Sequence, residues 1–302
     1  MTPDIIFPNI GITLNNVPRY FIGSERAESL IYLSWFPIDI YLYAVMILLG
    51  IGAAVFIGFY YVHRCGEKLD PYIDLLTLGL LFAFIGLRLY YMLFTWDGSD
   101  GRNPLTAFID VRSGGLAIYG GIIGATLAVV VISVKKNIPF TKIADYGAPS
   151  MLMGQVIGRW GNFFNREAFG GFSDGLLAMQ IRVDQSRVIT QELMDTALVS
   201  INGVDYFQVH PTFFYESFLN LLLMVALLFY REHKRFQGEI VLLYFFGYGV
   251  IRFFLESFRQ DQMPFFNTGI PLNQVTSLLF AGISFGFIIR GHLAKPAKKR
   301  KK

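Results

Sequence analysis

Long apolar stretches constrain the fold of this sequence most. Seven of them reach or approach the roughly 20 residues that a helix needs to cross a bilayer. Hydrophobic residues make up 54% of the 302 residues and charged residues only 16%, against about 25% charged residues in a typical soluble domain. The sequence therefore predicts an all-α polytopic membrane protein with seven transmembrane helices. The predicted spans are residues 38–62, 72–94, 115–134, 146–164, 211–230, 240–255 and 272–289.

Positive charge is distributed unevenly over the connections between these spans. All ten lysines lie after the first, third and fifth spans or in the C-terminal tail. Cytoplasmic loops of membrane proteins carry an excess of Lys and Arg. We therefore expect the C-terminus in the cytoplasm and the N-terminus outside, as an odd number of spans requires.

The chain divides into three predicted regions. Residues 1–37 form an outward-facing arm with an amphipathic segment from Glu25 to Trp35, which is suited to lie on the membrane surface. Residues 38–290 form the seven-helix transmembrane domain, and residues 170–209 within it form a small outward-facing cap with a strand-like stretch at 178–183 and a helical one at 190–193. Residues 291–302 form a basic tail that attracts anionic lipid headgroups. No aromatic residues interleave its lysines, so nucleic acid is not a predicted partner.

Three arginines, and no lysine, lie within the predicted spans or at their ends: Arg88, Arg159 and Arg252. Charged side chains in a membrane are costly and usually functional. The planar guanidinium group holds phosphate through a fork of donors, and every phospholipid headgroup contains phosphate. On the first interpretation, these three arginines bind the phosphate of a lipid headgroup. The alternative is that each arginine pairs with a carboxylate and joins two helices.

Spacing favours a headgroup site for two of the arginines. Arg159 and Asn162 are three residues apart, and Tyr248, Arg252 and Glu256 follow one another at intervals of four, so each set shares a helix face. The glycine-rich run at 114–124 contains Tyr119 and has two interpretations, helix packing through small residues or close approach of a headgroup to the backbone. His210 is either a general base, since its ordinary pKa lies near neutrality, or a hydrogen-bonded anchor. The single cysteine, Cys65, excludes an internal disulfide and gives no support to a metal site.

Four segments, in order, resemble the prolipoprotein diacylglyceryl transferase family. They are residues 114–121 (GGLAIYGG), 158–167 (GRWGNFFNRE), 210–216 (HPTFFYE) and 248–256 (YGVIRFFLE), and the resemblance covers about residues 36–290. It implies a multi-pass enzyme of the bacterial plasma (inner) membrane that catalyses the first step of lipoprotein maturation. The diacylglyceryl group of phosphatidylglycerol would pass to the lipobox cysteine in the signal peptide of a preprolipoprotein. The products would be a thioether and glycerol-1-phosphate, and no metal or organic cofactor is implied.

The resemblance also implies roles for individual residues. Arg159 and Arg252 would hold the phosphate and stabilise it as it leaves. Asn162 and Glu167 would orient the headgroup and Arg159, and Tyr248 and Glu256 would position Arg252. Tyr43, in the first span, would lie near the lipid.

The sequence departs from the family at Tyr119, where many members have a histidine that is a candidate for activating the thiol. Tyrosine has an ordinary pKa of about 10, so three routes stay open: a Tyr119 phenolate, His210 as base, or no dedicated base. A thiol with a pKa of about 8.5 already supplies a few per cent of thiolate, which favours the third route with Tyr119 as a hydrogen-bond donor. Two other functions compete: a phospholipid carrier or scramblase without transferase chemistry, and a structural anchor. The absence of an internal repeat argues mildly against the carrier.

Overall fold

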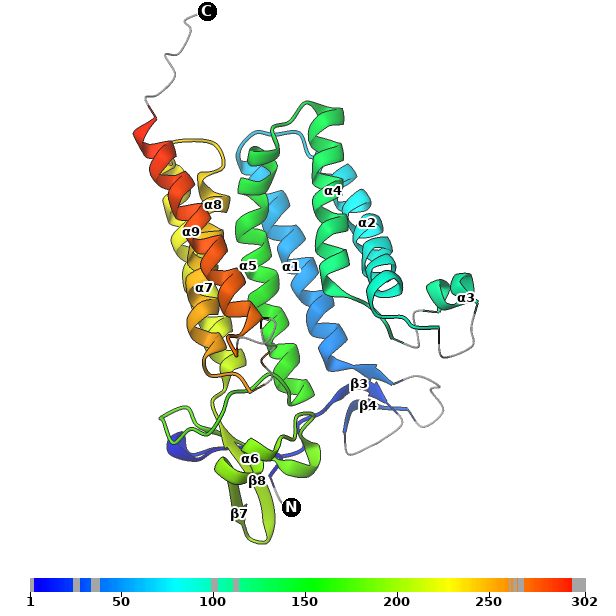
Figure 1. Cartoon of the computed structure of the whole chain (residues 1–302), viewed down its shortest axis with the longest axis vertical. Helices are drawn as coiled ribbons and strands as arrows, with labels where there is room; N and C mark the ends of the chain where they lie inside the picture. The colour runs from blue at the N-terminus through cyan, green and yellow to red at the C-terminus, as the bar shows by residue number, and fades with distance from the viewer. Residues whose placement is uncertain are drawn as a thin grey trace, which may run out of the picture. The chain divides into compact units, whose positions relative to one another are not determined.

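The computed structural model describes residues 3–23, 28–33, 39–98, 103–110, 114–260, 262, 265 and 269–294. Seven helices of 18 or more residues occur in these ranges, one at each predicted span (Figure 1). They are α1 (Leu42–Arg64), α2 (Asp70–Phe94), α4 (Ile118–Lys136), α5 (Phe140–Asn165), α7 (Thr212–Tyr230), α8 (Glu239–Glu256) and α9 (Leu272–Leu293). Two short helices are α3 (Pro104–Ile109) and α6 (Gln191–Thr196).

Five of the long helices are apolar and long enough to cross a membrane: α1, α2, α4, α9 and α7 together with the 3-10 turn at Arg231–His233. Helices α5 and α8 are not among these five. They carry half of the residues of the predicted site, including Arg159 on α5 and Arg252 on α8. The described residues thus give a mostly helical membrane protein, whereas the crossing of all seven helices stays a prediction.

Two β-sheets correct the all-α prediction. The five-stranded sheet has the order β2-β1-β6-β8-β7, and all neighbours in it are antiparallel. Its strands are β1 (Ile5–Phe7), β2 (Ile12–Leu14), β6 (Met179–Arg182), β7 (Leu198–Ile201) and β8 (Val204–Val209). The three-stranded sheet has the order β4-β3-β5, from β3 (Tyr20–Gly23), β4 (Ser29–Tyr32) and β5 (Ile40–Tyr41). Several of these strands have only two or three residues, too few to show an alternating pattern.

The expected strand and helix at 178–183 and 190–193 are confirmed as β6 and α6. The N-terminal region contributes strands to both sheets and is therefore more than an arm. Its amphipathic segment, Glu25 to Trp35, lies partly outside the described residues, and the described part contains β4. The basic tail from residue 295 also lies outside them.

The chain forms two compact units, residues 58–146 and residues 1–57 with 147–302. In the first unit, α2 and α4 pack through glycines. A Cβ atom on Gly120 would overlap the carbonyl oxygen of Gly86, and one on Gly124 would overlap that of Phe82. The glycine run therefore serves helix packing at these positions, because only glycine lets two backbones approach so closely.

Gly120→Ala is expected to destabilise the protein, because the new methyl group meets backbone that cannot move aside as a side chain would. Overpacking of this kind costs roughly 1 to 3 kcal/mol. Thermal unfolding in detergent measures the effect. Gly79→Ala on α2 is the matched control, since a Cβ there meets nothing within 4 Å, and an equal loss in both variants would contradict tight α2–α4 packing.

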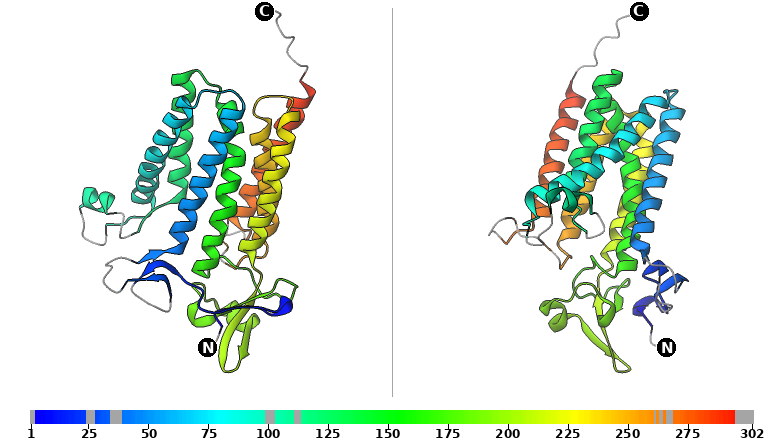
Figure 2. Two further views of the ribbon diagram at one scale, coloured as in Figure 1. Left: turned by 180° about the vertical axis from the view of Figure 1, so that it is seen from behind. Right: turned by 90° about the vertical axis from the view of Figure 1, so that its right-hand side faces the viewer.

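In the second unit, α5, α7, α8 and α9 lie side by side (Figures 1 and 2). Leu152 of α5, Met224 and Leu227 of α7, and Ile240 and Tyr244 of α8 form one buried apolar cluster. A second cluster joins the five-stranded sheet to the end of α5 and the start of α7. It contains Ile5, Ile181, Phe207, Phe163 and Phe213. The sheet therefore fixes the ends of α5 and α7, two of the helices that carry the candidate site.

Candidate functional site

Two guanidinium groups from different helices meet at one carboxylate. Arg159 of α5 donates from Nη2 to Glu216 Oε1 at 2.6 Å, and Arg252 of α8 donates from Nη1 to Glu216 Oε2 at 3.2 Å. The hydroxyl of Tyr248, one turn before Arg252, donates to Glu216 Oε1 at 3.2 Å. Glu216 lies near the start of α7. Three helices thus build one charged cluster.

A second carboxylate holds Arg252 from its own helix. Glu256 Oε2 lies 2.8 Å from Arg252 Nη2, four residues along α8. Asn273, near the start of α9, donates from Nδ2 to Glu256 Oε1 at 2.9 Å. Glu256 has no exposed surface, so this arrangement fixes the plane of the Arg252 guanidinium group.

Amide side chains hold Arg159 from the other side. Arg159 Nη1 donates to Asn162 Oδ1 at 3.4 Å, and Asn162 Nδ2 donates to Glu167 Oε1 at 3.2 Å. Asn165 Nδ2 donates to the same oxygen of Glu167 at 3.1 Å. The spacing of the GRWGNFFNRE segment therefore produces a chain of contacts that ends on Arg159.

Exposure falls from the arginines to the carboxylate between them. The side chain of Arg159 is 21% exposed and that of Arg252 is 13% exposed, whereas that of Glu216 is 2% exposed. Each guanidinium group has five N–H donors, and the contacts within the described residues engage only the two terminal nitrogens of each. Glu216 and Glu256 balance the two positive charges, and both arginine side chains keep some exposed surface.

Glu216 is the residue that sequence reasoning missed. It ends the HPTFFYE segment, where sequence reasoning assigns it no role. A usable signal was present, since Glu256 is the only acidic residue within four positions of either arginine, and two arginines in apolar helices require a further carboxylate. Sequence spacing relates residues on one helix, however, and Glu216 reaches both arginines across helices.

Tyr43 lies in the first turn of α1, against the same segment of α5. A Cβ atom on Gly161 would lie 2.9 Å from the Tyr43 ring. Glycine at 161 therefore lets the ring approach the backbone between Arg159 and Asn162. Gly50 and Gly154 continue this close contact, since a Cβ on Gly50 would lie 3.0 Å from the Gly154 carbonyl oxygen.

Arg88, in the other unit, binds the backbone. Its guanidinium group donates to five carbonyl oxygens, those of Ala107, Phe108, Asp110, Gly114 and Gly115. The residue is 2% exposed. Arg88 thereby fixes α3 and the segment that enters α4 through their backbone carbonyl groups.

Tyr119 lies in the first turn of α4, in the same unit as Arg88. It is 52% exposed, and its ring centroid lies 6.1 Å from that of Tyr90. The ring packs against Tyr90 on one side, and more than half of the residue is exposed.

His210 lies just before α7 and lines an apolar cavity of about 490 Å³. Its Nδ1 atom lies 3.4 Å from the Tyr215 hydroxyl, and its ring centroid lies 4.9 Å from that of Phe258. Burial lowers the pKa of His210 below its ordinary value, and Asp174 opposes this shift. His210 is therefore neutral at neutral pH and can accept a proton.

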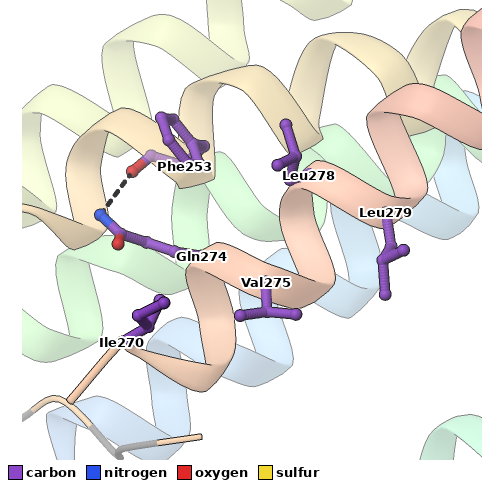
Figure 3. Close-up of a pocket in the computed structure, with 6 residues that line it drawn as sticks. All are labelled: Phe253, Ile270, Gln274, Val275, Leu278 and Leu279. Carbon is purple, nitrogen blue, oxygen red and sulfur yellow. Dashed lines mark hydrogen bonds between the residues drawn. The ribbon is translucent and has the colours of Figure 1, made fainter. Parts of the chain in front are cut away.

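A second apolar cavity, of about 290 Å³, lies along α8 and α9 (Figure 3). Phe253, Val275, Leu278 and Leu279 line it, and Gln274 donates to the Phe253 carbonyl at its edge. Both cavities suit hydrocarbon chains more than charged groups. The described residues contain no group of three or more His, Cys, Asp or Glu side chains that could hold a metal ion.

Comparison with known proteins identifies the family of the chain. The sequence model of the prolipoprotein diacylglyceryl transferase family matches residues 30–290. A phosphatidylglycerol–prolipoprotein diacylglyceryl transferase of Bacillus mycoides strain KBAB4 is 36% identical over 273 residues, covering 87% of this chain and 92% of the relative. The proteins of that name from Bacillus cereus strain G9842 and Bacillus anthracis strain A0248 are each 35% identical with the same coverage. The chain belongs to the prolipoprotein diacylglyceryl transferase family.

Proposed function

We propose that this protein transfers the diacylglyceryl group of phosphatidylglycerol to the lipobox cysteine of preprolipoproteins. The cysteine sulfur attacks the glyceryl carbon that carries the phosphate ester. The new C–S bond is a thioether, and the C–O bond to phosphate breaks. The phosphate leaves on its own glycerol as glycerol-1-phosphate, and the thiol proton passes to solvent or to a nearby base.

The observation that carries this proposal is the convergence of Arg159 and Arg252 on Glu216. The phosphate changes from a diester to a monoester as the C–O bond breaks, so its negative charge grows. Donors fixed where charge develops stabilise the transition state more than the bound substrate. Two arginine forks held by Glu216 and Glu256 supply such donors without rearrangement during the reaction.

The surrounding residues have positioning roles in this proposal. Glu216 holds both arginines, while Glu256 and Tyr248 orient Arg252. Asn162 and Glu167 orient Arg159 and supply polar contacts for the headgroup. Tyr43 borders the lipid beside Gly161, and Arg88 shapes the segment that leads to Tyr119.

We infer that the thiol needs no strong base, because a few per cent of it is ionised at neutral pH when its pKa is about 8.5. His210 is neutral and can take the proton, which supports a secondary role. Tyr119 keeps the role of a hydrogen-bond donor in the reaction that its place in the GGLAIYGG segment suggests.

Tyr119→Phe is expected to lower kcat/KM roughly ten- to a hundredfold, since a hydrogen bond to a charged group contributes about 1.5 to 3 kcal/mol. Tyr119→His should keep most activity, because the imidazole also donates. Steady-state transfer assays measure both changes. Tyr90→Phe is the matched control on the neighbouring ring, and an unchanged Tyr119→Phe enzyme would assign Tyr119 to packing alone.

The membrane arrangement belongs to the same proposal. Seven crossings place the predicted N-terminal arm (residues 1–37) and the predicted cap (residues 170–209) outside the bacterial plasma membrane and the lysine-rich connections in the cytoplasm. Support comes from the seven long helices and from the one-sided lysine distribution. The arginine cluster, near the ends of α5 and α8, would then lie in the outer half of the bilayer, where both substrates are embedded.

The test is incubation of the purified protein with labelled phosphatidylglycerol and a lipobox peptide. A thioether-linked diacylglyceryl peptide, together with glycerol-1-phosphate, is the expected product. A lipid carrier would move labelled lipid between vesicles and form no covalent product. Lipid movement without a covalent product would contradict the proposed transferase function and favour a lipid carrier.

A further inference from the structure

Polar side chains continue one helical turn beyond the arginine cluster, away from the five-stranded sheet. Gln155 lies one turn before Arg159 on α5, Asn220 one turn after Glu216 on α7, and Tyr244 one turn before Tyr248 on α8. Gln155 Nε2 donates to the Tyr244 hydroxyl at 3.0 Å, across α5 and α8. We refer to Gln155, Asn220 and Tyr244 as the amide layer.

The amide layer lies between a charged layer and an apolar one. On one side, Arg159 and Tyr248 meet at Glu216. On the other side, Leu152 and Met224 join the apolar cluster that includes Tyr244. Ser217 Oγ donates to the Val156 carbonyl at 2.9 Å, so α5 and α7 are in contact at this level. Asn220 therefore faces the interior of the helix group.

Three polar atoms of the amide layer lack a partner among the described residues. They are Oδ1 and Nδ2 of Asn220 and Oε1 of Gln155. Asn220 has no exposed surface. A buried polar group left unpaired costs about 1 to 3 kcal/mol, and more than nine in ten buried groups in proteins find a partner. Three such atoms from two neighbouring helices indicate a missing ligand.

We propose that the amide layer is a binding site for a neutral hydroxyl group. Oδ1 of Asn220 and Oε1 of Gln155 require a donor, whereas Nδ2 of Asn220 requires an acceptor. A hydroxyl group is both a donor and an acceptor. A phosphate oxygen or an ester carbonyl only accepts hydrogen bonds and would leave both amide oxygens unpaired. A cation would face the N–H donors of Asn220, which repel positive charge.

The hydroxyl has two possible sources, a buried water molecule or the terminal glycerol of a phosphatidylglycerol headgroup. The second source rests on the proposed function. With the phosphate at Arg159 and Arg252, the glycerol beyond it would extend toward Asn220, one helical turn away. The site would then recognise this headgroup by its hydroxyl groups, whereas the arginines recognise only phosphate.

The test compares two lipids by the thermal stability of the full chain in detergent. One is phosphatidylglycerol, and the other is phosphatidylpropanol with the same acyl chains, which keeps the phosphate but has no headgroup hydroxyl. A ligand that binds only the folded state raises Tm.

Asn220→Leu removes both polar atoms of the amide at similar side-chain size. Met224→Leu is the matched control, one turn along the same face of α7. Gln155→Met repeats the test from α5 if Asn220→Leu does not fold.

For a headgroup site, phosphatidylglycerol raises the Tm of the wild-type protein more than phosphatidylpropanol does. We expect a difference of at least about 2 °C, which Asn220→Leu removes and Met224→Leu keeps. For a water site, Asn220→Leu does not change the responses to the two lipids, but lowers the lipid-free Tm below that of Met224→Leu, because a bound water is costly to remove.

The proposal would be overturned if Asn220→Leu had an unchanged or higher Tm without lipid and unchanged responses to both lipids. This result is expected if nothing binds Asn220, because replacing an unpaired buried asparagine by leucine does not destabilise the fold. Failure of the proposed function gives a different result, in which neither lipid stabilises the wild-type protein. The lipid-free comparison would then still decide whether water occupies the site.

Discussion

Arg252→Lys is expected to lose about a hundredfold in kcat/KM although the positive charge is kept. Removal of one fixed donor to a developing negative charge costs about 100- to 1000-fold in other enzymes. Lysine presents a single ammonium group and cannot contact Glu216, Glu256 and a phosphate in one plane. Arg252 now contacts the first two from its two terminal nitrogens. Steady-state transfer from phosphatidylglycerol to a lipobox peptide measures the loss.

Arg290→Lys is the matched control for this substitution. Arg290 is exposed in the last turn of α9, so the same chemical change there should leave kcat/KM within about twofold, as is usual for an exposed substitution. Near-normal transfer by Arg252→Lys, with the control unchanged, would mean that charge alone is sufficient. We would then abandon the proposal that Arg252 holds the phosphate through the planar donors of its guanidinium group.

Glu216→Gln is expected to lower both stability and activity. Glu216 is 2% exposed and is the carboxylate shared by Arg159 and Arg252. Loss of one partner from a buried ion pair costs about 3 to 5 kcal/mol, because the remaining charges stay buried without compensation. For a chain of this size the melting temperature should fall by roughly 5 to 10 °C. Transfer activity should fall with it, since both guanidinium groups lose their orientation.

Glu232→Gln serves as the control, because Glu232 is exposed just beyond the end of α7. Thermal unfolding in detergent and transfer assays are run on both variants. A Glu216→Gln protein that is as stable as this control would show that the arginines do not depend on Glu216. A stable but inactive protein would instead give Glu216 a direct part in the reaction.

The helices could be predicted because apolar length is a local property of the sequence. The same holds for two parts of the site. Arg159 with Asn162, and Arg252 with Glu256, are neighbours on one helix, so their spacing alone places them on one face. The sharing of Glu216 could not be predicted, since it depends on how α5, α7 and α8 pack.

The sheets were missed for a different reason. Strand β1 has three residues, and its neighbours β2 and β6 come from near the start and the middle of the chain. A three-residue strand shows no period, and a distant partner leaves no local signal. The glycine run was left with two interpretations for a similar reason, because packing of Gly120 on Gly86 requires knowledge of the facing helix.

The pairing of β1 with β6 has a consequence for the order of events during synthesis. Ile5 pairs with Ile181, and four long helices lie between the two strands in the sequence. Strand β1 is made before β6 and therefore waits, with an open edge on the β6 side, until the chain has been synthesised through β6. Closing so long a loop adds little entropy cost, which grows only with the logarithm of loop length. This sheet can thus form only after the chain has been synthesised to its middle. A protein stalled before residue 179 would carry an unpaired strand edge that is open to other chains.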